Sequence, residues 1–175
     1  MADQAKLSSW HVGVAAEALA AAQFARCGYD VSVQYGANQP EYDLIVCKGE
    51  RLLKVSVKGS QDGAWGLTQS YLKERDYQGA IATWEQRHNP RTVLCFVQLQ
   101  GVALKDLPSL YLATPHEVAE RLRATAKGRG DTTLYVEHVW ASRAFAAGTV
   151  DKIPMDWVFT PQRVQTLMEN AWTVA

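Results

Sequence analysis

Hydrophobic and polar positions along the chain follow a helical period in some segments and a two-residue period in others. Apolar residues recur at helical spacing up to about Cys27, with Ser8 or Ser9 as the cap and Gly28 as the stop. Helices are also expected from about Glu74 to His88, after the cap Thr114 with Pro115 at the first position, and from Thr160-Pro161 to about Trp172. Alternating or wholly apolar runs predict strands at 29–35, 42–47, 52–58, 92–99, 110–113 and 132–139.

The order of these elements predicts an α/β fold with a central mixed β-sheet flanked by helices. Residues 36–40 break the first strand, and the turn at 48–50 joins the next two into a hairpin. Three glycines, at positions 59, 63 and 66, predict a loop after this hairpin. The run 92–99 is apolar enough for the centre of the sheet. A length of 175 residues suits one domain spanning 1–175.

Composition narrows the class of protein. The sequence is 47% hydrophobic and 21% charged, as in an ordinary soluble protein. Eighteen basic and eighteen acidic residues leave no net charge, which weakens the case for general electrostatic binding of nucleic acid but permits a local basic cleft. Three cysteines without metal-ligand spacing favour reduced thiols and a cytoplasmic setting. No stretch approaches the roughly 20 apolar residues of a membrane span.

The predicted hairpin carries an unusual set of polar residues. Asp43 lies on its first strand, and alternation puts Lys54, Ser56 and Lys58 on one face of the second. Lysine is depleted in strands, so two lysines beside an incoming aspartate point to a phosphodiester-cleaving site or its remnant. The alternative is an ion pair across the hairpin, between Asp43 and one of the lysines.

Glu17 is the one acidic residue between Gln4 and Tyr29. Because Val14, Ala21 and Phe24 lie three, four and seven positions away, helical spacing predicts that Glu17 is on the apolar stripe of the first helix. A carboxylate there costs several kcal/mol unless it meets a cation, a metal or strong donors. The alternative is that Glu17 lies at the edge of the stripe and pairs with an ordinary lysine.

These motifs resemble the PD-(D/E)XK nuclease superfamily, and within it the Holliday-junction resolvases and homing endonucleases. The resemblance rests on Gly13-x-x-x-Glu17, Gly28-Tyr29-x-Val31 and two hairpin motifs, and it covers about the first 60 residues. The hairpin motifs are Tyr42-Asp43-Leu44-Ile45-Val46 and Val55-Ser56-Val57-Lys58-Gly59. The resemblance implies a restriction-endonuclease-like fold and an Mg²⁺ (or Mn²⁺) ion held by Glu17 and Asp43. It also implies that Lys58 orients water or stabilises the transition state.

Ser56 departs from the family pattern, which has Glu or Gln at this position as a further metal ligand. A neutral hydroxyl is a poor ligand for a hard cation. Glu17 and Asp43 could still hold one hydrated ion with the Val57 carbonyl as a third oxygen. Glu41, Gln61 or Asp62 could supply a migrated ligand.

Several residues near the hairpin are candidates for contact with nucleic acid. Lys54, Ser60 and Gln61 lie on or beside the lysine strand, and Trp65 could stack on an unpaired base. The densest basic segment, 121–129, falls where a helix should end, and the helix dipole alone favours cations there.

The preferred function is therefore Mg²⁺-dependent endonucleolytic hydrolysis of DNA, with catalytic roles for Glu17, Asp43, Ser56 and Lys58. A second hypothesis is a nuclease fold without catalysis that binds nucleic acid or a protein partner. A third is an unrelated α/β domain in which Asp43 and Lys58 form only a salt bridge. A homodimer could cut two strands, with the tryptophan-bearing C-terminal third as its interface.

Overall fold

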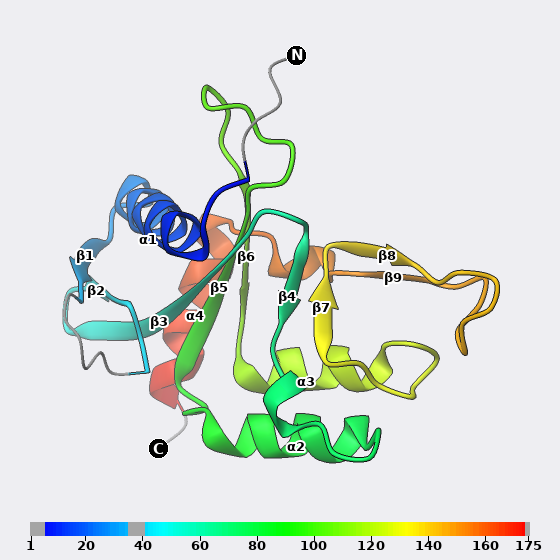
Figure 1. Ribbon diagram of the computed structural model, residues 1–175. Coiled ribbons are helices and arrows are strands. Elements are labelled where there is room, and N and C mark those ends of the chain that lie inside the picture. Colours follow the sequence, from blue (N-terminus) through cyan, green and yellow to red (C-terminus); the bar gives the residue numbers. More distant parts are fainter. Residues whose placement is uncertain (1–5, 35–40, 174–175) are drawn as a thin grey trace.

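The computed structural model describes residues 6–34 and 41–173. Within them, the main sheet has five strands in the order β1-β2-β3-β5-β6 (Figure 1). The strands are β1 (Asp30–Val33), β2 (Leu44–Lys48), β3 (Arg51–Ser60), β5 (Thr92–Gln98) and β6 (Ser109–Ala113). β3 and β5 run parallel, and the other neighbours run antiparallel. The sheet is therefore mixed, as the order of elements predicted.

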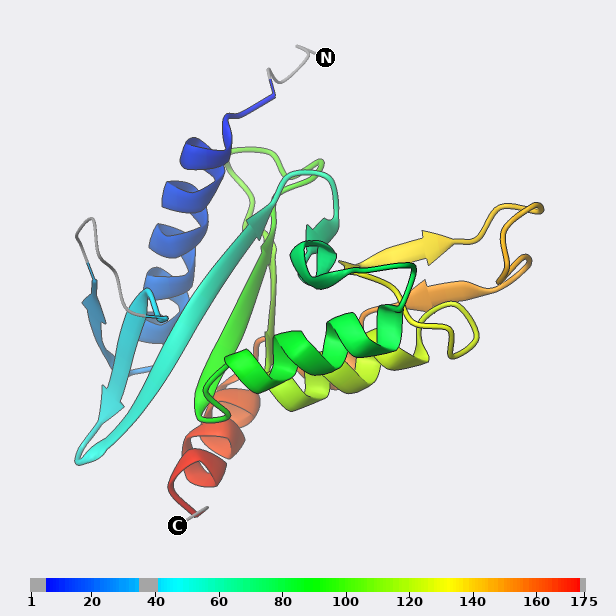
Figure 2. The same cartoon turned by 60° about the horizontal axis from the view of Figure 1, so that its bottom comes forward.

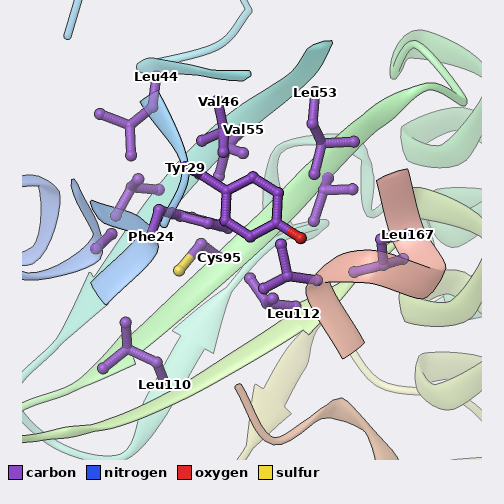
Figure 3. Packing of buried hydrophobic residues seen from close by; sticks show 14 of the residues in the cluster. Phe24, Tyr29, Leu44, Val46, Leu53, Val55, Cys95, Leu110, Leu112 and Leu167 are labelled. Carbon is purple, nitrogen blue, oxygen red and sulfur yellow. The ribbon is translucent and has the colours of Figure 1, made fainter. Parts of the chain in front are cut away.

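Helices cover both faces of this sheet. They are α1 (Ser9–Arg26), α2 (Tyr77–Arg87), α3 (Pro115–Ala124) and α4 (Pro161–Thr173). Apolar residues of α1 and α4 form one core with the strands, in which Phe24 and Tyr29 pack against Leu44 and Cys95 (Figure 3). Residues of α2 and α3 form a second core on the opposite face. Figure 2 shows α1 and the α2–α3 pair on opposite sides of β3 and β5.

Local signals fix the ends of the helices. Ser8 caps α1 by accepting a hydrogen bond from the His11 N–H, and Gly28 follows the helix with φ 78°, a conformation that favours glycine. Thr114 and Glu117 form a reciprocal capping box at the start of α3, with Pro115 at the first position. These three features are confirmed as the sequence predicted them.

The second helix begins later than the predicted start at Glu74. Glu74 and Arg75 have φ values of 48° and 66°, which a right-handed helix cannot contain. Asp76 caps the helix instead by accepting a hydrogen bond from the Gly79 N–H. The helix therefore starts at Tyr77.

The predicted strand 132–139 is two strands, β7 (Thr133–Tyr135) and β8 (Glu137–Val139). β7 pairs with β4 (Ala64–Gly66), which lies inside the predicted glycine loop, and β8 pairs with β9 (Val150–Lys152). Val136 lies between them, donating to the Gly63 carbonyl and accepting from the Ile153 N–H. The chain thus changes partner at Val136. The β8–β9 hairpin projects from the body of the molecule (Figure 1).

The lysine strand continues beyond its predicted end at Lys58, because Gly59 and Ser60 remain paired with β5. Tyr35 and the predicted break at 36–40 lie outside the described residues. Among residues 6–34 and 41–173, no helix has the length and apolar character needed to cross a membrane.

Candidate functional site

The candidate site lies where β3 extends beyond its neighbour β2. Leu44, the first residue of β2, pairs with Val55 of β3. From Val57 to Ser60, β3 continues against β5, on its other side. The edge of β3 that faces away from β5 is therefore open to side chains at this point.

Asp43 occupies the start of this open edge. Its N–H donates to the Val55 carbonyl at 2.9 Å, and its Oδ2 accepts the Val57 N–H at 2.6 Å. Ser56 Oγ donates to the same oxygen at 3.4 Å. Because the N–H and C=O of one residue in a strand point to the same edge, the Val57 carbonyl also faces Asp43's side of β3. Asp43 therefore has one oxygen engaged by backbone and a second oxygen available.

Glu17 approaches from α1. The buried stripe of this helix is made of residues four apart, Val12, Ala16, Ala20 and Phe24. Val14 is 48% exposed, so its predicted place on the stripe was wrong, whereas Phe24 is buried and Ala21 packs against the same core as predicted. Glu17 follows Ala16 and is half-buried at the border of the stripe. Helical geometry, with 100° between successive residues, accounts for this border position.

The electrostatics link Glu17 to both hairpin residues. Burial raises the pKa of the Glu17 carboxyl, repulsion from Asp43 raises it further, and Lys58 lowers it. Among residues 6–34 and 41–173, neither the Glu17 carboxylate nor the Lys58 ammonium has a hydrogen bond or an ion pair within 4.0 Å. Two carboxylates and one ammonium thus influence one another without a direct salt bridge.

The lysines do not form the salt bridge that the alternative hypothesis required. Within the described ranges, neither Lys54 nor Lys58 has a carboxylate within 4.0 Å. Lys54 Nζ lies 5.0 Å from the centre of the Tyr42 ring, a cation–π contact. Asp43 therefore takes its short contact from the backbone of Val57 rather than from a lysine.

The missing third carboxylate is not replaced by the residues proposed as migrated ligands. Ser56 is 4% exposed and neutral. Glu41 Oε1 accepts the Asn89 N–H at 2.9 Å, and Asp62 Oδ1 accepts from Ser60 Oγ at 2.8 Å. In the described part of the chain, no group of three or more His, Cys, Asp or Glu residues could hold a metal.

The remaining oxygen donors are of the chemical type that a hydrated Mg²⁺ prefers. This ion keeps several waters and is commonly held by one or two carboxylates together with substrate phosphates. Glu17, the free oxygen of Asp43 and the Val57 carbonyl are hard oxygen donors of that kind. Burial and then repulsion from Asp43 raise the pKa of Glu17, and a cation beside the two carboxylates would relieve that repulsion.

A cleft of about 410 Å³ adjoins Lys58. It runs between the first turns of α1, at Ser9 and Val12, and the segment from the end of β3 through β4. The sequence did not reveal this cleft, because its two walls are about fifty residues apart in the chain. Lys58 is one of the residues that line it.

Three predicted nucleic-acid contacts have structural partners beside the cleft. Trp65 is 4% exposed, packs edge-on against Phe96 and donates from Nε1 to the Lys58 carbonyl at 2.8 Å. This burial does not fit stacking on an unpaired base. Gln61 exchanges two hydrogen bonds with the backbone of Leu7, at 2.9 and 2.8 Å. Ser60 is buried, and its Oγ accepts from the Ala64 N–H at 3.1 Å.

The basic segment 121–129, which begins in the last turn of α3, is also engaged with protein groups. Arg121 pairs with Asp151 at 2.7 Å, and Arg123 pairs with Glu85 at 2.6 Å. Arg129 lies over the rings of Tyr77, Trp140 and Phe145. These contacts favour a structural role for the segment over phosphate binding.

One solved structure with a related fold is a bacterial homing endonuclease, I-Ssp6803I. It matches with a TM-score of 0.52 and 12% sequence identity, over 96% of this chain and 98% of the other. At this identity the likeness shows the fold alone, and that fold agrees with the predicted nuclease-like architecture. No protein-family model matches the sequence, and the search of curated proteins found no match.

Proposed function

We propose that this protein is a Mg²⁺-dependent endonuclease of the PD-(D/E)XK type that hydrolyses phosphodiester bonds in DNA. The observation that carries the proposal is the arrangement of Asp43, held by the Val57 N–H one residue before Lys58, with the Glu17 carboxylate near enough for both charges to affect its pKa. The fold shared with a homing endonuclease supports it.

Each residue has a distinct task in this proposal. Glu17, Asp43 and the Val57 carbonyl hold the ion, with the Val57 N–H fixing the orientation of Asp43. A divalent ion bound there polarises the phosphoryl oxygens and neutralises developing charge. Lys58, at the mouth of the cleft, holds the attacking water or stabilises the negative charge of the pentacovalent transition state. Ser56 keeps Asp43 in place and supplies no charge.

Incubation of the pure protein with duplex, single-stranded and branched DNA tests the proposal, with Mg²⁺ or Mn²⁺ and with EDTA as the metal-free control. Cleavage should require metal and should vanish in Asp43→Ala. Removal of one stabilising group from such a site typically costs about 100-fold to 1,000-fold in rate, which we expect for Lys58→Met. Cleavage that persists in both variants would show that the activity belongs to a contaminant.

A second candidate is a nuclease fold without catalysis that binds nucleic acid or a protein. The neutral, buried Ser56 at the position of the usual ligand favours it. Calorimetry separates the two candidates: the first requires Mg²⁺ binding that is lost in Asp43→Ala, and the second predicts no such binding. DNA binding without metal dependence or cleavage would support the second.

A further inference from the structure

Gly59 forms a close contact between the lysine strand and α1. A Cβ atom at this position would lie 2.8 Å from Val12 Cγ1, 2.9 Å from Ala16 Cβ and 2.9 Å from the Val12 carbonyl oxygen. Side-chain carbons do not approach heavy atoms this closely, and one of these three contacts is with backbone. Any larger residue at position 59 must therefore move α1 away from β3.

The contact lies beside the candidate site in both segments. Gly59 follows Lys58 in β3, and Glu17 follows Ala16 in α1. Val57 and Gly59 face α1, because Val57 belongs to the core that α1 covers. The separation of α1 from β3 at Gly59 therefore determines how far the Glu17 carboxylate reaches toward the open edge of the sheet, where Asp43 lies.

We propose that Gly59 is a positioning residue, which sets the height of α1 above β3 and through it the distance between the carboxylates of Glu17 and Asp43. The inference rests on the proposed function, because this distance matters most if the two groups share an ion. Ligand distances in a metal site are defined to within about 0.2 Å. The clash at position 59 requires a larger shift than that, since carbon atoms separate to about 3.5–4.0 Å at van der Waals contact.

The test measures Mn²⁺ binding by calorimetry in the wild type and in Gly59→Ala. We expect affinity to fall at least tenfold in the variant. A compensating variant, Val12→Ala/Ala16→Gly/Gly59→Ala, removes the two side-chain contacts but not the one with the Val12 carbonyl, and should recover part of the affinity. Leu122→Ala, in the core on the other face of the sheet, is the stability control: its unfolding temperature should fall while Mn²⁺ affinity stays at the wild-type value.

A second measurement is independent of metal. Crystal structures without metal should show the Glu17 and Asp43 carboxylates farther apart in Gly59→Ala than in the wild type, with an intermediate separation in the compensating variant. Wild-type affinity in Gly59→Ala, or an unchanged carboxylate separation, would overturn the inference. If Gly59→Ala does not fold, the compensating variant is compared with Val12→Ala/Ala16→Gly, which keeps Gly59, and equal Mn²⁺ affinities and equal carboxylate separations in the two would overturn the inference.

Failure of the proposed function gives a different result. A wild-type protein that binds no Mn²⁺ contradicts the metal site itself, and the carboxylate separation in the metal-free crystals then decides the role of Gly59 alone.

Discussion

Asp43 Oδ2 accepts a hydrogen bond from the Val57 N–H at 2.6 Å, at the point where β3 extends beyond β2. This bond ties a residue just before one strand to the backbone of the next, and the other carboxylate oxygen of Asp43 has no hydrogen-bond partner among residues 6–34 and 41–173. A charge-assisted bond of this length is strong and orients the group that accepts it. Because Val57 immediately precedes Lys58, the same bond fixes the position of Asp43 relative to the lysine.

Glu17→Gln should stabilise the metal-free protein while it removes Mg²⁺ binding. The folded-state pKa of Glu17 is raised, so the ionised form is disfavoured in the fold, and wild-type stability falls as pH rises from the ordinary glutamate pKa through the raised one. Because Glu17 is partly exposed, the gain at neutral pH should be less than about 1 kcal/mol. Thermal unfolding at pH 7 and pH 4 checks it. A gain as large at pH 4 as at pH 7 would contradict this origin.

Mg²⁺ affinity should fall as the solution is acidified, and the loss should begin above the ordinary pKa of a glutamate. The physical reason is competition, since a proton on Glu17 must leave before the carboxylate can act as a ligand, and burial and Asp43 raise its pKa. Calorimetric titrations between pH 5 and pH 8 measure this dependence. An affinity that is constant over this range would show that Glu17 is not a ligand.

Ser56→Glu should raise Mg²⁺ affinity by at least about tenfold, because a third carboxylate increases the charge of the donor set. In the metal-free protein the same change puts a charge at a 4%-exposed position beside Asp43 and should destabilise the fold by about 1–3 kcal/mol. Addition of Mg²⁺ should reverse this loss. Ser56→Gln, of similar size and uncharged, is the control. Equal metal affinities in the two variants would contradict the role assigned to charge.

Trp65→Phe should reduce stability by about 1 kcal/mol without changing DNA affinity. The substitution removes the hydrogen bond from Nε1 to the Lys58 carbonyl but keeps a ring against Phe96. Denaturant unfolding and fluorescence-based DNA titration measure the two quantities. A large loss of DNA affinity with unchanged stability would restore the base-stacking role that the burial of Trp65 argues against.

Parts of the site could be predicted because they depend on short-range periodicity. Asp43, Ser56 and Lys58 were identified from alternation along two adjacent strands, and the hairpin places them with no help from distant residues. Glu17 was identified as the one acid of an apolar helix. The position of Glu17 around the helix axis could not be predicted as well, because the packing of α1 against the sheet decides which helix residues are buried. Val14, for example, is exposed.

Other features depend on contacts that the sequence does not record. The burial of Trp65 follows from its packing against Phe96, about thirty residues away. The division of 132–139 into two strands follows from the two partners of Val136, Gly63 and Ile153. The shifted start of α2 comes from left-handed backbone at Glu74 and Arg75, residue types for which this conformation is uncommon. In each of these three cases, the local sequence alone favours a structure other than the one that the distant contacts produce.

Crystals soaked in Mn²⁺ provide the most direct test of a metal site between Glu17 and Asp43. We predict an anomalous density peak at an oxygen-ligand distance, roughly 2.0–2.6 Å, from a carboxylate oxygen of each residue, and no peak in crystals of Asp43→Ala. A peak at another location, or none in crystals of the wild-type protein at saturating Mn²⁺, would contradict the proposed nuclease chemistry.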